Sequence, residues 1–486
     1  MLHHLCLVSG FLSMAGPAVS AAKALDLSPI QQEMVRHLDS LQPELVAVNQ
    51  DIWTYAEVGL QEYRSATRLV GLLKKAGFRV REGVSNMPTA FIAEYGSGSP
   101  VIGITVEYDA LPELSQEVTA ERKPAAGRSA GHGCGHCALG TAAVASALAV
   151  RAVYDQHGLK GTIRVYGTPA EETCIGKVYM TLDGCFKDLD VCLHWHPSGS
   201  NRSWYASSQA MISAKFTFTG VAAHAAGSPE KGRSALKAVE LMNIGVNYMR
   251  EHVKETSRIH YVITDGGAQP NVVPPTAQVW YYVRGSTHED AEYLFEWLQE
   301  IAEAAAKMTR TKMRMQVDTD CHEIIPNLPL SRLITKNLKR IGPPQFSPED
   351  LNLARQLQKS VAVQFGSKED KALKDTIEEI PEKPPAEKGS TDVGDISWHV
   401  PTGGLNTVCS AAGSPGHSWQ IVAASGSPIA HKGMLVAGKV LALTAVDLLQ
   451  NPQILKEAKA DFQERMKQRP YTTKIPKGQK APKAIR

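Results

Sequence analysis

Apolar runs alternate with helical patterns in the first part of the chain. Residues 101–108 (VIGITVEY) form a continuous apolar run, which is typical of a strand buried on both faces of a sheet. Further strands are predicted at 89–95, 161–167 and 189–194, and an alanine-rich helix at 138–154. Strands that alternate with helices favour an α/β fold, with a mostly parallel sheet covered by helices on both sides.

The pattern changes between residues 210 and 322. Apolar and polar residues alternate strictly from Met211 to Thr219, which predicts a strand with one solvated face. An apolar stripe then predicts a helix at about 233–253. The region continues with predicted strands at 259–264, 278–284 and 312–317 and a predicted helix at 289–308. The order β-α-β-β-α-β is that of a ferredoxin-like sandwich, so we expect an inserted α+β lid or dimerisation domain at 210–322.

The insertion divides the rest of the chain. A length of 486 residues is more than one ordinary core needs. We therefore expect a catalytic domain in two parts, 22–209 and 323–450. Residues 451–486 are predicted to be a C-terminal extension whose Lys-, Arg- and Pro-rich end is solvated and disordered. A polyanion- or membrane-binding arm is the alternative for this tail.

The N-terminus has the pattern of an export signal. An apolar run from Leu5 to Gly16 precedes the small residues Val19-Ser20-Ala21, which predicts a signal peptide at 1–21 and a secreted, periplasmic protein. No basic residue precedes the run, so an ordinary N-terminal helix and a cytoplasmic location are the alternative.

Composition narrows the possible partners. A hydrophobic content of 43% and a charged content of 21% are those of a soluble globular protein, and the net charge is only +3. No basic stripe interleaved with aromatic residues is present, so we expect no nucleic-acid partner. No apolar run after the first 22 residues is predicted to span a bilayer, so we expect no membrane partner either.

Candidate chemistry gathers at the ends of the predicted strands. Glu107-Tyr108-Asp109, Pro169-Ala170-Glu171-Glu172 and His194-Trp195-His196 each end a strand, and the carboxyl edge of a parallel sheet is where ligands bind. A fourth motif, GHGCGH at 131–136, runs into the helix at 138–154. Thiolate, imidazole and carboxylate are ligands that zinc accepts, and of two adjacent glutamates one can bind metal while the other acts as a general base. The motifs together predict a catalytic metal site.

These motifs resemble those of a known family. The chain is similar to the aminoacylase and carboxypeptidase metallopeptidases that use two zinc or manganese ions, and within them to the amidohydrolase branch that includes the p-aminobenzoyl-glutamate hydrolases. The resemblance runs from about residue 40 to 450. It rests on EYDALPELSQ (107–116), GHGCGHCALGTA (131–142), GTPAEET (167–173), DVCLHWHPSG (190–199), GVAAHAAGSPEKGRSAL (220–236), GGAQPNVVPPTAQVWYYVRG (266–285), GSTDVGDISWHVPT (389–402) and SPGHSWQ (414–420).

The resemblance implies a role for each motif residue. Two divalent ions, zinc or manganese with cobalt also possible, would be bound by Cys134, His136, Glu172, His196 and His417. Cys134 would stand in place of the family's bridging aspartate, and His194 is the alternative to His196. Position 137, Asn or Asp in relatives, is Cys here and is expected to be a small residue without a role.

The resemblance also implies the groups that act on the substrate. Glu171 would be the general base, and His224 of the lid would stabilise the oxyanion. Asn271 and Arg284 would hold a substrate carboxylate.

We therefore expect an enzyme that cleaves an amide bond through a metal-activated water. Its substrate would be a small amide with a carboxylate: an N-acyl amino acid, an aminobenzoyl-glutamate-like compound or a dipeptide. The resemblance implies a homodimer through the lid, or a heteromer with a related subunit. A hydrolase with Cys134 as nucleophile and a non-catalytic metal-binding subunit are the alternatives.

Overall fold

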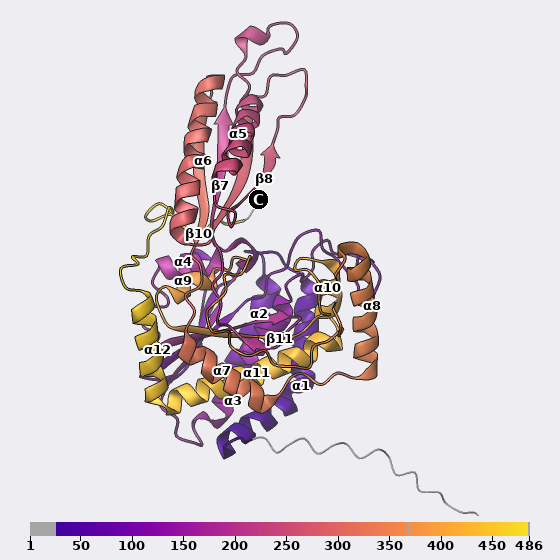
Figure 1. Cartoon of the computed structure of the whole chain (residues 1–486), viewed down its shortest axis with the longest axis vertical. Helices are drawn as coiled ribbons and strands as arrows, with labels where there is room; N and C mark the ends of the chain where they lie inside the picture. The colour runs from indigo at the N-terminus through magenta and orange to yellow at the C-terminus, as the bar shows by residue number, and fades with distance from the viewer. Residues whose placement is uncertain (1–25, 368, 485–486) are drawn as a thin grey trace, which may run out of the picture.

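A computed structural model describes residues 26–367 and 369–484 (Figure 1). The predicted signal peptide lies outside the described residues. The helices are α1 (Pro29–Tyr55), α2 (Tyr63–Lys75), α3 (His136–Tyr154), α4 (Gly176–Leu182), α5 (Ala235–Met249), α6 (His288–Thr309), α7 (Leu328–Ile341), α8 (Pro348–Phe365), α9 (Val393–Ser397), α10 (Trp419–Ser425), α11 (Pro428–Gln450) and α12 (Pro452–Arg465). The strands are β1 (Arg79–Glu82), β2 (Phe91–Ser97), β3 (Val101–Val106), β4 (Gly161–Gly167), β5 (Val191–Ser198), β6 (Arg202–Ser203), β7 (Ala210–Thr219), β8 (Arg258–Asp265), β9 (Thr276–Gly285), β10 (Lys312–Cys321) and β11 (Thr402–Val408).

The larger sheet confirms the predicted mostly parallel fold. Its strand order is β1-β2-β4-β3-β5-β11-β6. The central strands β4, β3, β5 and β11 run parallel, whereas β1, β2 and β6 pair antiparallel at the two edges. The carboxyl ends of β3, β4 and β5 therefore lie next to one another.

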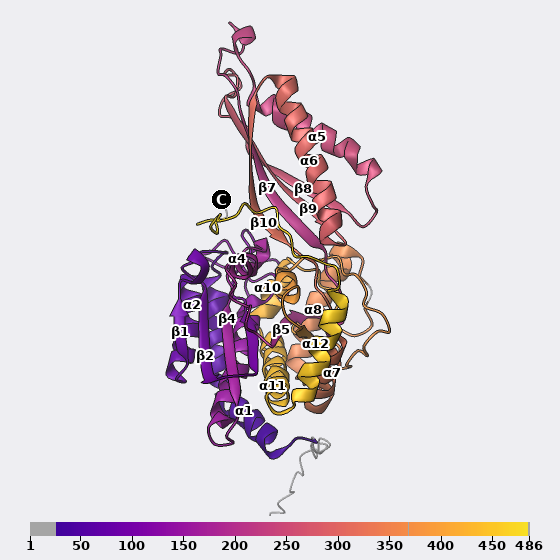
Figure 2. The same cartoon turned by 90° about the vertical axis from the view of Figure 1, so that its left-hand side faces the viewer.

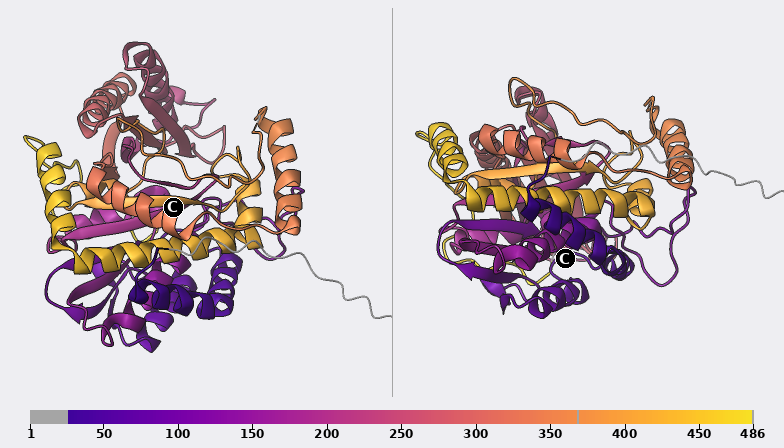
Figure 3. Two further views of the ribbon diagram at one scale, coloured as in Figure 1. Left: turned by 60° about the horizontal axis from the view of Figure 1, so that its bottom comes forward. Right: turned by 90° about the horizontal axis from the view of Figure 1, so that it is seen from below.

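The two faces of this sheet support two cores. Along β5, Val191, Leu193 and Trp195 join a core with α1, α3 and α11, whereas Cys192 joins the core that contains α4 and continues into the lid. Among the described residues, α3 and α11 are long and apolar enough to span a membrane, but 89% and 72% of their apolar windows are buried inside the molecule. They pack against each other and against α1, as the view from below shows (Figure 3), so they are core helices.

The lid is a separate layer that projects from the catalytic domain (Figure 2). Its sheet has the antiparallel order β10-β7-β9-β8, with α5 and α6 packed on one face. This confirms the ferredoxin-like topology. The alternation in β7 gives the predicted buried face, because Ile212, Ala214, Phe216 and Phe218 are all fully buried.

The C-terminal tail differs from the solvated, disordered segment that its composition predicts. After α12 the chain crosses from the catalytic domain to the base of the lid. Ile475 and Ala481 are buried in the core shared by lid and catalytic domain, and the Tyr471 hydroxyl donates to Asp395 Oδ1 at 2.7 Å. The Lys- and Pro-rich composition predicts disorder because the few residues that hold the tail in place are widely spaced in the sequence.

Candidate active site

The four predicted motifs meet at the carboxyl edge of the larger sheet. Asp109 follows β3, Glu171 and Glu172 follow β4, and His196 lies in the last part of β5. His136 is the first residue of α3, and Gly135 before it has a φ of 79°, a left-handed conformation that glycine adopts without strain. This sharp turn directs the helix N-terminus and Cys134 toward the strand ends.

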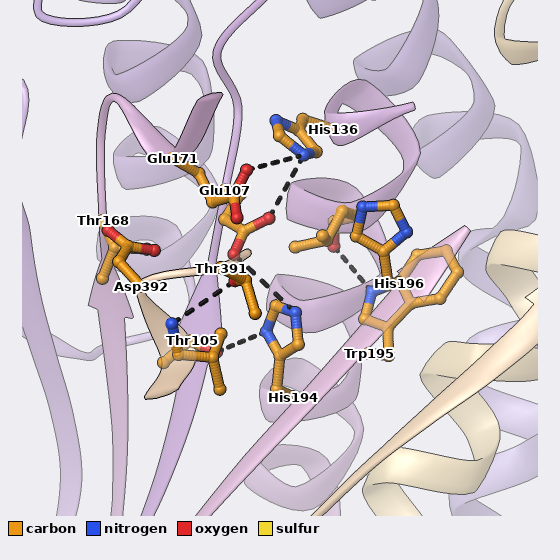
Figure 4. Close-up of polar contacts among 12 residues, drawn as sticks. Thr105, Glu107, His136, Thr168, Glu171, His194, Trp195, His196, Thr391 and Asp392 are labelled. Atoms are coloured by element: carbon orange, nitrogen blue, oxygen red, sulfur yellow. Dashed lines mark hydrogen bonds and ion pairs between the residues drawn. The ribbon is translucent and has the colours of Figure 1, made fainter. Parts of the chain in front are cut away.

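The position along β5 distinguishes His196 from His194. Both side chains lie on the same face of the strand, two residues and about 6.6 Å apart along it. His194 is buried in the sheet, where its Nδ1 lies 2.7 Å from Thr105 Oγ1. His196 reaches the edge and lies with Cys134 and His136, so the structure brings His196 into the cluster and leaves His194 behind it (Figure 4).

The predicted metal ligands form two sets that share one sulfur. Cys134, His136 and His196 offer ligand atoms within 4.8 Å of one another, and so do Cys134, Glu172 and His417. A thiolate common to both sets is the arrangement that a bridging ligand between two ions requires. All five predicted ligands are thus brought together.

Hydrogen bonds fix which nitrogen of each imidazole faces the cluster. His136 Nδ1 lies 2.9 Å from Asp109 Oδ1, and because a carboxylate only accepts, Nδ1 donates and Nε2 is the nitrogen that faces the cluster. The other oxygen of Asp109 accepts from the Glu172 amide at 3.0 Å. His196 Nδ1 donates to the Pro197 carbonyl at 2.7 Å. These contacts orient the ligands in the way that metal-binding histidines need.

The electrostatics favour a thiolate at Cys134. Burial alone would raise the pKa of this thiol, but the adjacent imidazoles of His136, His196 and His417 lower it well below its ordinary value. The hydrogen bond to Cys134 and the contact of His417 Nε2 with Glu172 Oε2 at 3.1 Å raise the pKa of His417 to about 11. Burial, then the nearby thiolate, raises the pKa of Glu172 to about 7. The predicted ligands thus surround one sulfur, and the charge of each shifts the pKa values of its neighbours.

Glu171 lies in a loop held by a residue that the sequence patterns missed. Ala170 before it and Cys174 after it have φ values of 56° and 53°, a conformation that costs non-glycine residues energy and needs external support. The buried Glu62 carboxylate supplies that support, because its Oε1 accepts from the Ala170 amide at 2.8 Å. Burial and the neighbouring Glu107 raise the pKa of Glu171 well above its ordinary value.

A buried ion cluster beneath the site was also missed. The Lys177 ammonium lies 2.7 Å from Glu107 Oε1 and 2.6 Å from Asp392 Oδ1, and none of these three side chains is exposed. Asp392 comes from the GSTD segment, far along the chain, so no local pattern could pair it with Lys177.

One cavity of about 930 Å³ is lined by four of the five predicted ligands, all but His136, and extends to the base of the lid. Cys134, Glu171 and His417 line it from the catalytic domain, and Arg284 lines it from β9. Arg284 Nη1 donates to Ser390 Oγ at 2.6 Å, which places a guanidinium on the wall facing the metal ligands. Cys137 lies outside this wall: its thiol is fully buried, and burial raises its pKa to about 12.

Two predicted lid residues lie far from this cavity. His224 and Asn271 are exposed in neighbouring loops, where the Ala225 amide donates to the Asn271 carbonyl at 2.9 Å. These loops join β7 and β9 at Thr219 and Thr276, the end of the lid opposite Gly285. The structure therefore does not bring His224 and Asn271 to the site, and their roles stay predictions.

Comparisons with known proteins agree with the fold and the site. Residues 207–310 match the family model of the M20 peptidase dimerisation domain. The chain is 38% identical over 472 residues to one of the two subunits of the p-aminobenzoyl-glutamate hydrolase of Escherichia coli, covering 92% of this chain and 98% of the relative. It is 28% identical over 470 residues to the Xaa-Arg dipeptidase of Mus musculus, covering 92% and 95%.

A solved structure supports the same fold. The YXEP protein of Bacillus subtilis, a dinuclear metal binding peptidase of the M20 family, superposes with a TM-score of 0.54 at 16% identity, over 85% of this chain and 99% of that one. The chain therefore belongs to the M20 family of metallopeptidases. Within it the chain is a metal-dependent hydrolase of amide bonds, with clear sequence similarity to an aminobenzoyl-glutamate hydrolase.

Proposed function

We propose that the chain binds two divalent metal ions and hydrolyses the amide bond of a small acyl amino acid that carries a free carboxylate. Zinc or manganese is the proposed metal, with cobalt as a third possibility. The observation that carries the proposal is the pair of ligand sets that share Cys134 within one cavity.

The residues fit such a metal centre. His136 Nε2 and Glu172 Oε1 are buried without a hydrogen-bond partner among the described residues, which is costly unless a cation binds them. The donors are a thiolate, imidazoles and a carboxylate, the ligands of catalytic zinc sites. When bound, the ions supply Lewis acidity that lowers the pKa of a water and polarises a carbonyl.

Glu171 is the proposed general base. Its carboxylate lines the cavity beside the ligand sets, and its Oε2 lies 3.7 Å from His136 Nε2. In this role Glu171 takes a proton from the attacking water and returns it to the leaving amine. His224 is the proposed donor to the oxyanion, and Arg284, with Asn271, is the proposed partner of the substrate carboxylate.

The substrate and the assembly are proposed from the relatives. An aminobenzoyl-glutamate-like amide is the first candidate, because the relative at 38% identity is named for that substrate. Other N-acyl amino acids and dipeptides fit the same cavity, which has room for a ligand of that size. We propose a homodimer through the lid, with a heteromer as the alternative, and export to the periplasm on the pattern of residues 1–21.

Metal analysis combined with a hydrolysis screen tests this proposal. The full chain should hold about two ions, and hydrolysis of p-aminobenzoyl-glutamate, N-acyl amino acids or dipeptides should stop with a chelator and return with zinc or manganese. Glu171→Gln should keep both ions and lose about 10²- to 10⁴-fold in kcat, the usual contribution of a general base. Hydrolysis that is indifferent to chelation, or a Glu171→Gln variant with full turnover, would contradict it.

A further inference from the structure

The Glu107 carboxylate faces the same nitrogen that the proposed metal site uses. Glu107 Oε2 lies 3.3 Å from His136 Nε2, and Figure 4 shows Glu107 and Glu171 converging on this ring, from the segments that follow β3 and β4. Glu107, His136 and Glu171 form a third set of candidate ligand atoms, all within 4.8 Å of one another and all buried. The predicted ligands do not include Glu107.

The hydrogen bonds around this contact leave two buried ligand atoms facing each other. His136 donates from Nδ1 to Asp109, so Nε2 is the nitrogen that it turns toward the Glu107 carboxylate. Glu107 Oε2 and His136 Nε2 are both buried without a hydrogen-bond partner among the described residues. Buried polar atoms without a partner are costly, and a cation bound between this oxygen and this nitrogen would satisfy both.

Lys177 explains how a carboxylate is held in this place. Its ammonium contacts Glu107 Oε1 at 2.7 Å and Asp392 Oδ1 at 2.6 Å, and its backbone amide donates to Asp392 Oδ2 at 2.9 Å. The ion pair engages Oε1 and turns Oε2 toward His136. Since Lys177 is the second residue of α4, the same contacts tie the start of this helix to the end of β3 and to the segment before α9.

We propose that Glu107 is a further carboxylate ligand of the ion that His136 binds, and that Lys177 is the buried positioning residue that aims it. The proposal rests on the metal centre proposed above. It makes the site more anionic than a five-ligand set, because a carboxylate is added on the side of the catalytic base.

The alternative is that Glu107, Lys177 and Asp392 form an ion cluster with a structural role alone. Removing either carboxylate of such a cluster would lower the stability of the fold. If Glu107 is a metal ligand, a substitution of Glu107 should instead weaken metal binding, and a substitution of Asp392 should not. The two carboxylates are a matched pair, because both are fully buried and both contact Lys177 Nζ at similar distances.

The test is a zinc titration of the metal-free full chain against a competing chelator, with zinc content measured directly and the fold monitored by circular dichroism. For Glu107→Gln we expect the affinity for one of the two ions to fall by at least about tenfold, as for losses around other metal sites. Asp392→Asn should stay within about twofold of the wild type. If Glu107→Gln fails to fold, Glu107→Asp, which keeps the charge and withdraws the oxygens, should show the same weakened ion.

Three other results would contradict the proposal. Wild-type affinity for both ions in a folded Glu107 variant would overturn the assignment of Glu107. Equal weakening in Glu107→Gln and Asp392→Asn would also overturn it, in favour of the structural cluster. A wild-type chain that binds no zinc would overturn the proposed function itself, and with it this ligand.

Discussion

At the scale of single residues, Cys134 is the position where two chemical interpretations separate. Its sulfur belongs to both ligand sets and is shared among three histidines, whereas a cysteine nucleophile needs one base beside it. The surroundings of Cys134 therefore favour a bridging ligand.

A substitution distinguishes these interpretations. Cys134→Asp keeps an anionic donor at the shared position, so we expect the variant to retain chelator-sensitive hydrolysis at a level reduced by about 10- to 100-fold. Cys134→Ala should lose metal and activity together. Metal content and kcat of both variants are the measurements, and a Cys134→Asp protein as inactive as Cys134→Ala, with its metals in place, would favour the nucleophile.

The residues found by sequence and those missed differ in a physical way. Glu172 and His196 stand in short motifs at strand ends, and Cys134 and His136 in a glycine-rich motif that leads into α3, so the carboxyl edge of a parallel sheet gathers them, whereas His417 was assigned only by the family resemblance. Glu62 and Lys177 act through partners 108 and 215 positions away, Ala170 and Asp392. No local pattern encodes such a pairing, and only the folded chain reveals it.

At the scale of elements, the lid was predicted closely and β11 was not. The alternation in β7 is visible in the sequence because one face of the lid sheet is partly exposed to solvent. Strand β11 reads TGGLNTV, with two glycines and no apolar run, and it is buried because β5 and β6 pair on either side of it and α7 and α11 pack against it. Its burial comes from its neighbours, which its own pattern does not show.

The base of the lid contains a histidine whose charge should affect stability. His288 begins α6, and its Nε2 lies 2.7 Å from Asp320 Oδ1 on β10. Burial lowers the pKa of His288, but the hydrogen bond to Asp320 outweighs it and the net shift is upward. Burial raises the pKa of Asp320, but the same bond turns the net shift downward. The His322 ring stacks on His288, the Asp395 carboxylate approaches from α9, and Glu292 faces the pair from α6.

The sign of these shifts sets a pH window. Because the pKa of His288 is raised, its charge stabilises the folded state fully below the ordinary value of 6.5, and this stabilisation is lost as pH rises through the folded pKa. Because the pKa of Asp320 is lowered, its contribution to stability is present above 3.8. We expect His288→Gln to lower the free energy of unfolding by about 1–3 kcal/mol at pH 5–6, and by less at pH 9. Denaturant unfolding of both proteins across this range is the measurement, with His252→Gln at an exposed position of the lid as the control. A deficit that does not shrink toward pH 9 would contradict the charged pair.

At the scale of the whole molecule, the geometry of the lid limits what His224 can do. Strand β7 runs ten residues from the base of the lid to its tip, about 33 Å. His224 lies beyond the tip and Arg284 near the base, beside the cavity. Because rotation of a rigid lid about its base does not shorten this distance, lid closure within one chain cannot bring His224 to its own site. A role for His224 therefore requires a second copy.

The edge of the lid sheet suggests how two copies would meet. Strand β8 is the last in the order β10-β7-β9-β8, and its Val262 and Ile263 are 48% and 46% exposed. Among the described residues no further strand pairs with β8; such an apolar edge is a template for another strand, and an edge lysine blocks the pairing. We expect the wild type to be a dimer by light scattering and Val262→Lys to be a monomer. Met308→Lys, at a comparably exposed apolar site on α6 away from this edge, should remain dimeric.

The same variant tests the link between assembly and turnover. The monomeric Val262→Lys protein should keep both metal ions, because every proposed ligand lies within one catalytic domain. Its kcat should fall by about 10²- to 10³-fold, the effect of removing one oxyanion donor, and His224→Ala in the dimer should fall by the same factor. Combining the two substitutions should then cost no more than either one alone. A monomer with full kcat would exclude His224 from the reaction, since its own lid cannot deliver it.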